Sequence, residues 1–409
     1  MSRRASGSRL MTKAALGVGM SSVLLLLFEL FARLGLGAPP EPPGLWQRWD
    51  SRRPSFEIAD AWVTTRYQDR SEPTVFSAHA DPSVPRVVFM GGSTMHGGSR
   101  IATELEIPAA AARLMEERGT PIEALNLGNP GLDSHDIRQL AIEALAFEPR
   151  MLVIYTGHND LGNTLQEQRY GSYGGALQVR LRLLLWHSRA YLLLRDLLLP
   201  QATVGDAARR RPQPGSTEQV MSPSQRLLAA EALERNLSAI AGQAGEHGVG
   251  LVLLTPISNW LMCPPIGRGC PEARGIIDLD AYGIRPLPRH EHPRLEQAIS
   301  VYPDCAELLH ARGRARFGDG APGASEDLRH ALETDPSPMR ATAAMVEAVR
   351  AAARDNGAGL VDLDAVVLDQ HGVPPQSWFL DCLHFSPEGH ATVGALVAQA
   401  IETQLGATP

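Results

Sequence analysis

Short apolar runs alternate along this chain with longer segments in which apolar residues recur at helical spacing. The runs are almost continuously apolar, which is typical of parallel strands that are buried on both faces. The predicted strands are Arg86 to Met90, Ala124 to Leu127, Met151 to Tyr155, Gly250 to Leu254 and Gly359 to Leu363. The predicted helices are Ile107 to Arg118, Ser134 to Phe147, Gln225 to His247 and Pro387 to Gln404. The alternation predicts a three-layer α/β/α domain with about five parallel strands and helices on both faces.

Two stretches interrupt this alternation, and we interpret them as helical insertions. The first spans about 162–224 and holds a leucine-rich run whose arginines point in several helical directions. That scatter argues against a regular amphipathic membrane helix, and leaves either a pocket wall or an ordinary packed helix. The second spans about 262–338. Its part at about 290–336 resembles one tetratricopeptide-like helix pair, with Gly313 and Leu328 at matching positions. A single pair cannot stack into a solenoid, so we expect it to pack on the core, with a protein partner as a further possibility.

The N-terminal segment has the pattern of an exported or anchored protein. Its basic residues are Arg3, Arg4, Arg9 and Lys13. An uncharged run, 14–28, follows them, and Glu29 and Arg33 are spaced to pair on one helix face. We predict that residues 1–37 anchor the chain in a membrane and that the remainder lies outside the cytoplasm, in the periplasm or cell envelope. The alternative is a cleaved signal peptide and a secreted protein, with a weak cleavage site at 35–37.

Composition and charge limit the kinds of partner and binding site that the chain can have. Residues 38–85 are rich in proline and predict a linker and lead-in to the domain at 86–409. The formal charge of −7 argues against nucleic acid as a partner, because phosphate binding requires a basic face. Four cysteines, at positions 263, 270, 305 and 382, match no zinc-binding spacing, so we predict no metal site. In an oxidising compartment, Cys263 and Cys270 either close a short disulfide loop or remain free thiols.

Candidate chemistry is concentrated where predicted strands end. Ser93 follows the first strand and a Gly-Gly pair, a sequence that turns sharply and leaves the hydroxyl exposed. Asn159 follows the third strand, where its amide can donate to a developing oxyanion. Asp381 and His384 are three residues apart, just before the last helix, so the carboxylate can orient the imidazole. Because the carboxyl ends of parallel strands share one edge, we expect Ser93 and Asn159 at that edge. The free ring nitrogen of His384 is expected to face Ser93.

Taken together, the blocks containing Ser93, Gly131, Asn159 and His384 resemble the SGNH (GDSL-like) hydrolase family in their order and in the elements that carry them. The resemblance covers about 86–404 without the insertions, and it implies a flavodoxin-like sheet. It departs from the family at Gly92, where an aspartate is common. The nucleophile motif of other α/β hydrolases, G-x-S-x-G, fits poorly because Met95 replaces its second glycine.

The resemblance implies a metal-independent hydrolase of acyl or acetyl esters that needs no cofactor. In that reading Ser93 attacks, His384 shuttles the proton and Asp381 orients it. Gly131, Asn159 and the backbone amide of Ser93 hold the oxyanion. Gly128 is the less suitable glycine. The substrate would be a small-molecule or glycan-linked ester. Two alternatives stay open: an O-acyltransferase that acts on an envelope glycan, and a catalytically silent scaffold.

Three further polar residues have competing interpretations. His158 and Asp160 flank Asn159, but no other ligand spacing supports a metal there. Arg340 follows the second insertion. It would clamp a substrate carboxylate or phosphate if the insertion folds over the pocket, or else it lies at a helix start in solvent or in a surface ion pair.

Overall fold

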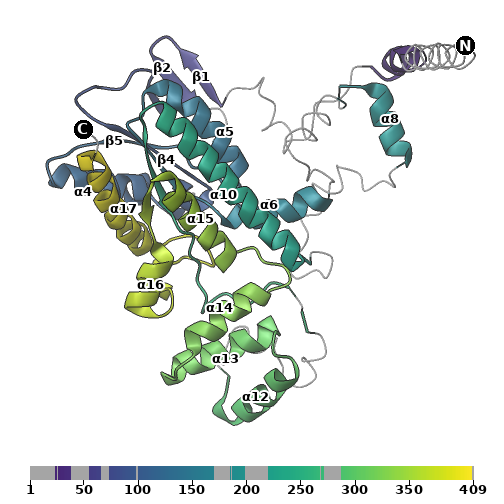
Figure 1. The fold of residues 1–409 in the computed structure, drawn as a ribbon, viewed down its shortest axis with the longest axis vertical. Helices are drawn as coiled ribbons and strands as arrows, with labels where there is room; N and C mark the ends of the chain where they lie inside the picture. The colour runs from purple at the N-terminus through teal and green to yellow at the C-terminus, as the bar shows by residue number, and fades with distance from the viewer. Residues whose placement is uncertain are drawn as a thin grey trace, which may run out of the picture. The chain divides into compact units, whose positions relative to one another are not determined.

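The structure is a computed structural model. It describes residues 24, 26–37, 55–65, 73–97, 100–169, 185, 187–198, 220–267, 269–270 and 287–407. The chain divides into two compact units, one of residues 1–53 and 170–211, the other of residues 54–169 and 212–409. The larger unit contains the predicted α/β domain, and its elements are labelled in Figure 1.

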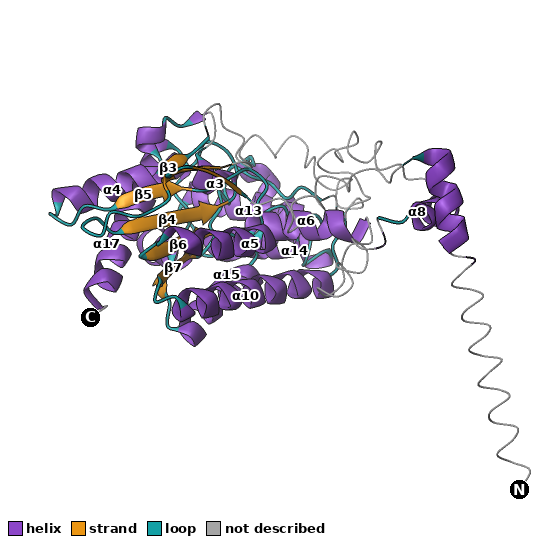
Figure 2. Ribbon diagram, turned by 90° about the horizontal axis from the view of Figure 1, so that it is seen from above, coloured by secondary structure: helices purple, strands orange, loops and turns teal. Residues whose placement is uncertain are grey.

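Five parallel strands form the central sheet of the larger unit (Figure 2). They are β4 (Arg86–Gly91), β5 (Glu123–Asn126), β6 (Met151–Tyr155), β7 (Gly250–Leu254) and β8 (Gly359–Val361). Their spatial order is β5-β4-β6-β7-β8. In chain order this is 2-1-3-4-5, the flavodoxin-like arrangement, which places candidate residues at the carboxyl ends of the strands. The predicted fold class and all five predicted strands are confirmed.

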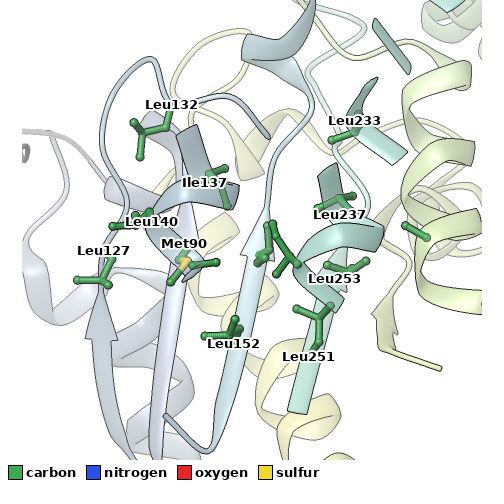
Figure 3. Close-up of a cluster of buried hydrophobic side chains, with 14 of the residues drawn as sticks. Met90, Leu127, Leu132, Ile137, Leu140, Leu152, Leu233, Leu237, Leu251 and Leu253 are labelled. Carbon is green, nitrogen blue, oxygen red and sulfur yellow. The ribbon is translucent and has the colours of Figure 1, made fainter. Parts of the chain in front are cut away.

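Helices cover both faces of this sheet, as the continuous apolar strands require. Val88 and Met90 point to one face, where the helices are α5 (Ser134–Ala144), α10 (Pro223–Glu246) and α15 (Ala343–Asn356). Figure 3 shows this core, with leucines of β6 and β7 meeting side chains of α5 and α10. Val87 and Phe89 point to the opposite face, where the helices are α4 (Ile107–Glu117), α16 (Leu363–His371) and α17 (Pro387–Ala407). Figure 1 shows α4 beside α17.

A small antiparallel sheet precedes the domain, within the range that composition predicts to be a linker and lead-in. Its strands are β1 (Phe56–Ala59), β2 (Trp62–Thr65) and β3 (Val75–Ser77). Phe56 and Phe76 pack edge-on against Phe147, with ring centroids 5.0 and 5.4 Å away. Each strand is only three or four residues long, so no alternation of period two is recognisable in the sequence.

The second insertion is helical, as expected. It contains a 3₁₀ turn (Arg289–Glu291), α12 (His292–Val301), α13 (Ala306–Asp319) and α14 (Ala324–Thr334). The last two pack closely at Gly313, where a Cβ atom would lie 2.7 Å from Cγ of Leu328. A close helix pair therefore occupies the predicted range. Its likeness to a tetratricopeptide unit, and a protein partner for it, stay predictions.

The cysteines pair differently from either sequence interpretation of Cys263 and Cys270. Cys263 is bonded to Cys382, and Cys270 is bonded to Cys305. The bridges join positions 119 and 35 residues apart in the sequence. Both the short disulfide loop and the free thiols are therefore wrong, because each cysteine finds its partner through the tertiary fold and not in its own loop.

The smaller unit contains a helix at 26–36 and α8 (Arg189–Leu198), which lies in the leucine-rich run of the first insertion. Among the described residues, no helix is both long and apolar enough to cross a membrane. The basic residues that precede the apolar run, and most of the first insertion, lie outside the described residues.

Candidate active site

Ser93 begins a short helix, α3 (Ser93–His96), directly after β4. The Gly91-Gly92 pair makes this turn possible because other backbone and side-chain atoms lie very close. A Cβ atom on Gly91 would lie 2.5 Å from the carbonyl oxygen of Tyr155, and one on Gly92 would lie 2.5 Å from Nδ2 of Asn159. A side chain at position 92 would therefore displace Asn159.

The loop at 381–384 brings the predicted base to Ser93. Nε2 of His384 lies 2.8 Å from Oγ of Ser93. Nδ1 of the same ring lies 2.9 and 2.8 Å from the two carboxylate oxygens of Asp381. Ser93 and His384 are 291 residues apart in the sequence. Together with Asp381 they nevertheless form one hydrogen-bonded row, as predicted. All three are half-buried, so the row is accessible from solvent.

Asp381 is held as a carboxylate by several donors. Burial alone would raise its pKa, but the backbone N–H groups of His384 and Leu383 donate to Oδ1 at 2.9 Å each. With the Arg100 guanidinium and the His384 ring, these donors lower the pKa of Asp381 well below its usual range. Asp381 is therefore ionised at neutral pH, the state in which a carboxylate can orient an imidazole.

Arg100 is a residue of this cluster that the sequence did not mark. Its Nη2 atom donates to Oδ2 of Asp381 at 2.6 Å and lies 3.1 Å from Nδ1 of His384. It lies in a segment without helical or strand periodicity, and its contact with Asp381 spans 281 positions. No local pattern could have distinguished it from the other arginines.

Asn159 lies in the first turn of α6 (His158–Arg169), where the sequence predicted only a position past a strand. One hydrogen of its amide donates to the carbonyl oxygen of Leu132 at 2.8 Å. That bond fixes Nδ2 beside Gly92, next to Ser93. A second amide hydrogen is available on the same nitrogen for a ligand.

Gly131 has a φ of +81°, in the left-handed region that favours glycine. Its carbonyl oxygen accepts a hydrogen bond from Nδ2 of Asn163 at 3.2 Å. Asn163, one turn after Asn159, also donates to Asp133 at 2.7 Å and so holds the loop that contains Gly131. In contrast, the N–H of Gly128 donates to Oδ1 of Asn126 at 2.9 Å. The Gly128 amide is thus already engaged, which supports Gly131 as the better candidate.

The neighbours of Asn159 are engaged within the fold. Nδ1 of His158 accepts the N–H of Ala341 at 3.0 Å, and its Nε2 lies 3.1 Å from the carbonyl oxygen of Ile257. Burial lowers the pKa of His158 to about 3, so the ring is neutral. Burial, with Asp133 nearby, raises the pKa of Asp160 to about 7. Both side chains belong to the scaffold beneath the site.

Arg340 differs from both sequence interpretations. Only 3% of its surface is exposed, and its Nη1 atom donates to the carbonyl oxygen of Asn259 at 3.3 Å. Burial lowers its pKa to about 10. The prediction of a solvent or surface position is wrong, and a buried guanidinium directed at a backbone carbonyl gives no support to a substrate clamp. The loop before α15 folds inward at this point, which no local pattern reveals.

No protein-family model matches the chain, and no curated protein is found to be similar to it. Among solved structures, a lipase/acylhydrolase from Enterococcus faecalis is 14% identical with a TM-score of 0.38, covering 78% of this chain and 96% of that one. A GDSL-like lipase from Bacteroides thetaiotaomicron is 12% identical with a TM-score of 0.34, covering 78% and 88%. The psychrotrophic esterase EstA from Pseudoalteromonas sp. is 11% identical with a TM-score of 0.36, covering 78% and 98%. Similarity at this level carries no inference about the activity of this chain.

Proposed function

We propose that this protein is a serine-dependent hydrolase of carboxylic esters, of the SGNH type. The observation that carries the proposal is the 2.8 Å contact between Nε2 of His384 and Oγ of Ser93, with Asp381 on the other ring nitrogen. A nucleophile, a base and an orienting carboxylate in this row form the arrangement that acyl transfer needs. Labelling of Ser93 by a fluorophosphonate, together with turnover of an activated ester, tests it.

The reaction follows from these positions. His384 accepts the hydroxyl proton as Oγ of Ser93 bonds to the ester carbonyl carbon, and the carbonyl oxygen becomes an oxyanion. The imidazolium then gives its proton to the leaving alcohol as the carbon–oxygen bond breaks, which leaves an acyl-Ser93. Water, deprotonated by His384, attacks this acyl group and releases the acid, while Ser93 regains its proton. A sugar hydroxyl in place of water would make the same site an acyltransferase.

Three donors are suitable for the oxyanion: the backbone N–H groups of Ser93 and Gly131 and the side-chain amide of Asn159. The bond from Asn159 to Leu132 supports this role, because it fixes the amide before substrate arrives. Preorganised donors stabilise developing charge without reorganisation at the moment of reaction.

Asn159→Ala is therefore expected to lower kcat by about 10² to 10³-fold with a much smaller effect on KM, since the lost donor acts mainly in the transition state. Steady-state hydrolysis of p-nitrophenyl acetate measures both constants. Asn356→Ala, at an exposed position on α15, is the matched control and should leave them unchanged. An Asn159→Ala enzyme as fast as the wild type would remove Asn159 from the oxyanion site.

We also propose that the smaller unit attaches the protein to a membrane and that the hydrolase unit works outside the cytoplasm. The support is that the helix at 26–36 and α8 each provide a side chain that hydrogen-bonds to backbone groups at an end of the other helix. The Glu29 carboxylate accepts the N–H groups of Arg189 and Ala190, at 3.1 and 2.9 Å, at the start of α8. Arg189 in turn donates to the carbonyl oxygens of Leu36 and Gly37, at 2.8 and 3.1 Å, at the end of the helix at 26–36.

The same two helices also expose many apolar side chains. Arg33 is also engaged, donating to Glu29 at 2.5 Å and to the carbonyl oxygen of His187 at 2.6 Å. Leu34 is 75% exposed and Leu197 is 81% exposed, and further leucines and phenylalanines of the N-terminal helix are exposed beside them. Charged groups that bond to each other beside exposed apolar side chains suit the membrane interface, where Arg33 remains about half exposed. The two disulfides support an oxidising compartment for the larger unit.

Replacing Leu193, Leu194 and Leu197 together with serine should therefore weaken binding to anionic phospholipid vesicles, because the three side chains are exposed on α8. The full chain and the variant are compared by flotation, and we expect the bound fraction to fall by about half or more, given roughly 0.8 kcal/mol for each buried CH₂ group. Leu227→Ser with Leu228→Ser, two exposed leucines on α10, is the control. Equal loss of flotation in both variants, or in neither, would contradict a role for α8.

A further inference from the structure

We propose that the Cys263–Cys382 disulfide is a positioning element of the active site, which holds His384 at bonding distance from Ser93. This inference rests on the proposed function. Cys382 lies between Asp381 and His384, so the bridge is attached to the catalytic loop itself. Its other end, Cys263, is buried at the start of the second insertion.

The loop fixes its own shape but not its distance from Ser93. The N–H of Leu380 donates to the carbonyl oxygen of His384 at 2.8 Å, and the neighbouring residues Phe379 and Phe385 form an antiparallel bridge. Asp381 accepts two backbone N–H groups inside this loop. These bonds act between residues 379 and 385 alone. They would survive a movement of the whole loop away from β4.

Contacts with other segments decide where the loop lies. The N–H of Asn259 donates to the carbonyl oxygen of Cys382 at 3.0 Å, and Oγ1 of Thr94 donates to the carbonyl oxygen of Leu383 at 3.4 Å. The carbonyl oxygen of Asn259 in turn accepts a hydrogen bond from the buried Arg340. Among the described residues, the bridge to Cys263 is the one covalent tie between the catalytic loop and the segment after β7. Arg100 also contacts the loop through Asp381, and Phe379 and Phe385 anchor its two ends in the core. The bridge acts between these anchors and restrains the loop more firmly than either hydrogen bond.

The second disulfide provides a matched control. Cys270–Cys305 lies within the second insertion, where Cys270 and Cys305 belong to a small core with Leu287, Leu295 and Leu308. Its loss removes a bridge of the same chemistry without touching the loop that contains His384. A purely stabilising role would make the two bridges equivalent in kinetics, whereas a positioning role makes them different.

The test compares Cys263→Ala/Cys382→Ala with Cys270→Ala/Cys305→Ala in the full chain, using p-nitrophenyl acetate. We expect kcat of the first variant to fall by about 10 to 10²-fold with KM nearly unchanged, since a misplacement on the order of 1 Å costs about that much. The second variant should keep kcat within about 2-fold. Labelling of Ser93 by fluorophosphonate should slow in parallel with kcat. Equal kcat values in the first variant and the wild type would overturn the proposal, and so would equal losses in both variants.

Reduction and reoxidation keep the proposal testable if the first variant does not fold. The Cys270→Ala/Cys305→Ala protein carries a single bridge. A phosphine should reduce it to two thiols and lower kcat, and oxidised glutathione should restore both the bridge and kcat. Unchanged turnover in fully reduced, folded protein would contradict the positioning role. A wild-type protein that neither labels nor turns over would instead contradict the proposed function, so the two failures are distinguishable.

Discussion

Ser93→Ala is expected to lower kcat for an ester substrate by about 10⁴-fold or more, because no other group at this position can form the acyl intermediate. The hydroxyl is 2.8 Å from the base, and its loss leaves only the oxyanion donors and binding to act on the substrate. Steady-state kinetics with p-nitrophenyl acetate measures the loss. Removing a half-buried hydroxyl should leave the unfolding temperature almost unchanged.

Ser300→Ala is the matched control, because Ser300 lies on an exposed part of α12 and donates only to the carbonyl oxygen of Gln297. Its kcat should equal that of the wild type. A Ser93→Ala protein that keeps a tenth or more of wild-type turnover would show that esters are cleaved elsewhere in the chain or by another chemistry.

His384→Ala should lower kcat by about 10⁴-fold, as much as Ser93→Ala does, since the serine hydroxyl then has no base. The loss should be strongly non-additive with that of Ser93→Ala, because the two side chains act as one unit. The double variant is therefore expected to be about as slow as either single variant. Kinetics of the three proteins at one pH measures this directly.

His247→Ala, an exposed position at the end of α10, should behave as the wild type. Full additivity of the Ser93 and His384 losses would mean that the two residues act independently, against the row of contacts in the structure. Because the pKa of Asp381 is far below its usual range, any loss of wild-type activity between about pH 5 and 7 cannot come from protonation of that carboxyl.

The sheet was predictable because its strands are buried on both faces and therefore continuously apolar. Met151–Tyr155 and Gly250–Leu254 were predicted to the residue. The start of α6 was not predicted, since its first turn is mostly polar and is followed by Gly162, where a Cβ atom would lie 3.3 Å from Cε of Met339. Helix boundaries at a polar site depend on tertiary contacts that apolar periodicity does not record.

The candidate site likewise contains residues that the local sequence predicts and residues that it does not. Ser93, Asp381 and His384 were predictable because each lies beside an element with a clear local pattern, and the structure brings them into contact, while their roles in catalysis stay predictions. Arg100 and the partner of Cys382 were not predictable, since they meet the site across 281 and 119 positions of the chain. Such contacts are set by the finished fold.

The most direct test of the central claim is fluorophosphonate labelling of the full chain in detergent, with mass mapping of the label and p-nitrophenyl acetate turnover in parallel. We predict that the label is found on Ser93, that the ester is hydrolysed, and that His384→Ala loses both. Label on Ser93 without turnover would favour an acyltransferase that lacks its acceptor. Folded wild-type protein without label or turnover would contradict the account and favour a catalytically silent scaffold.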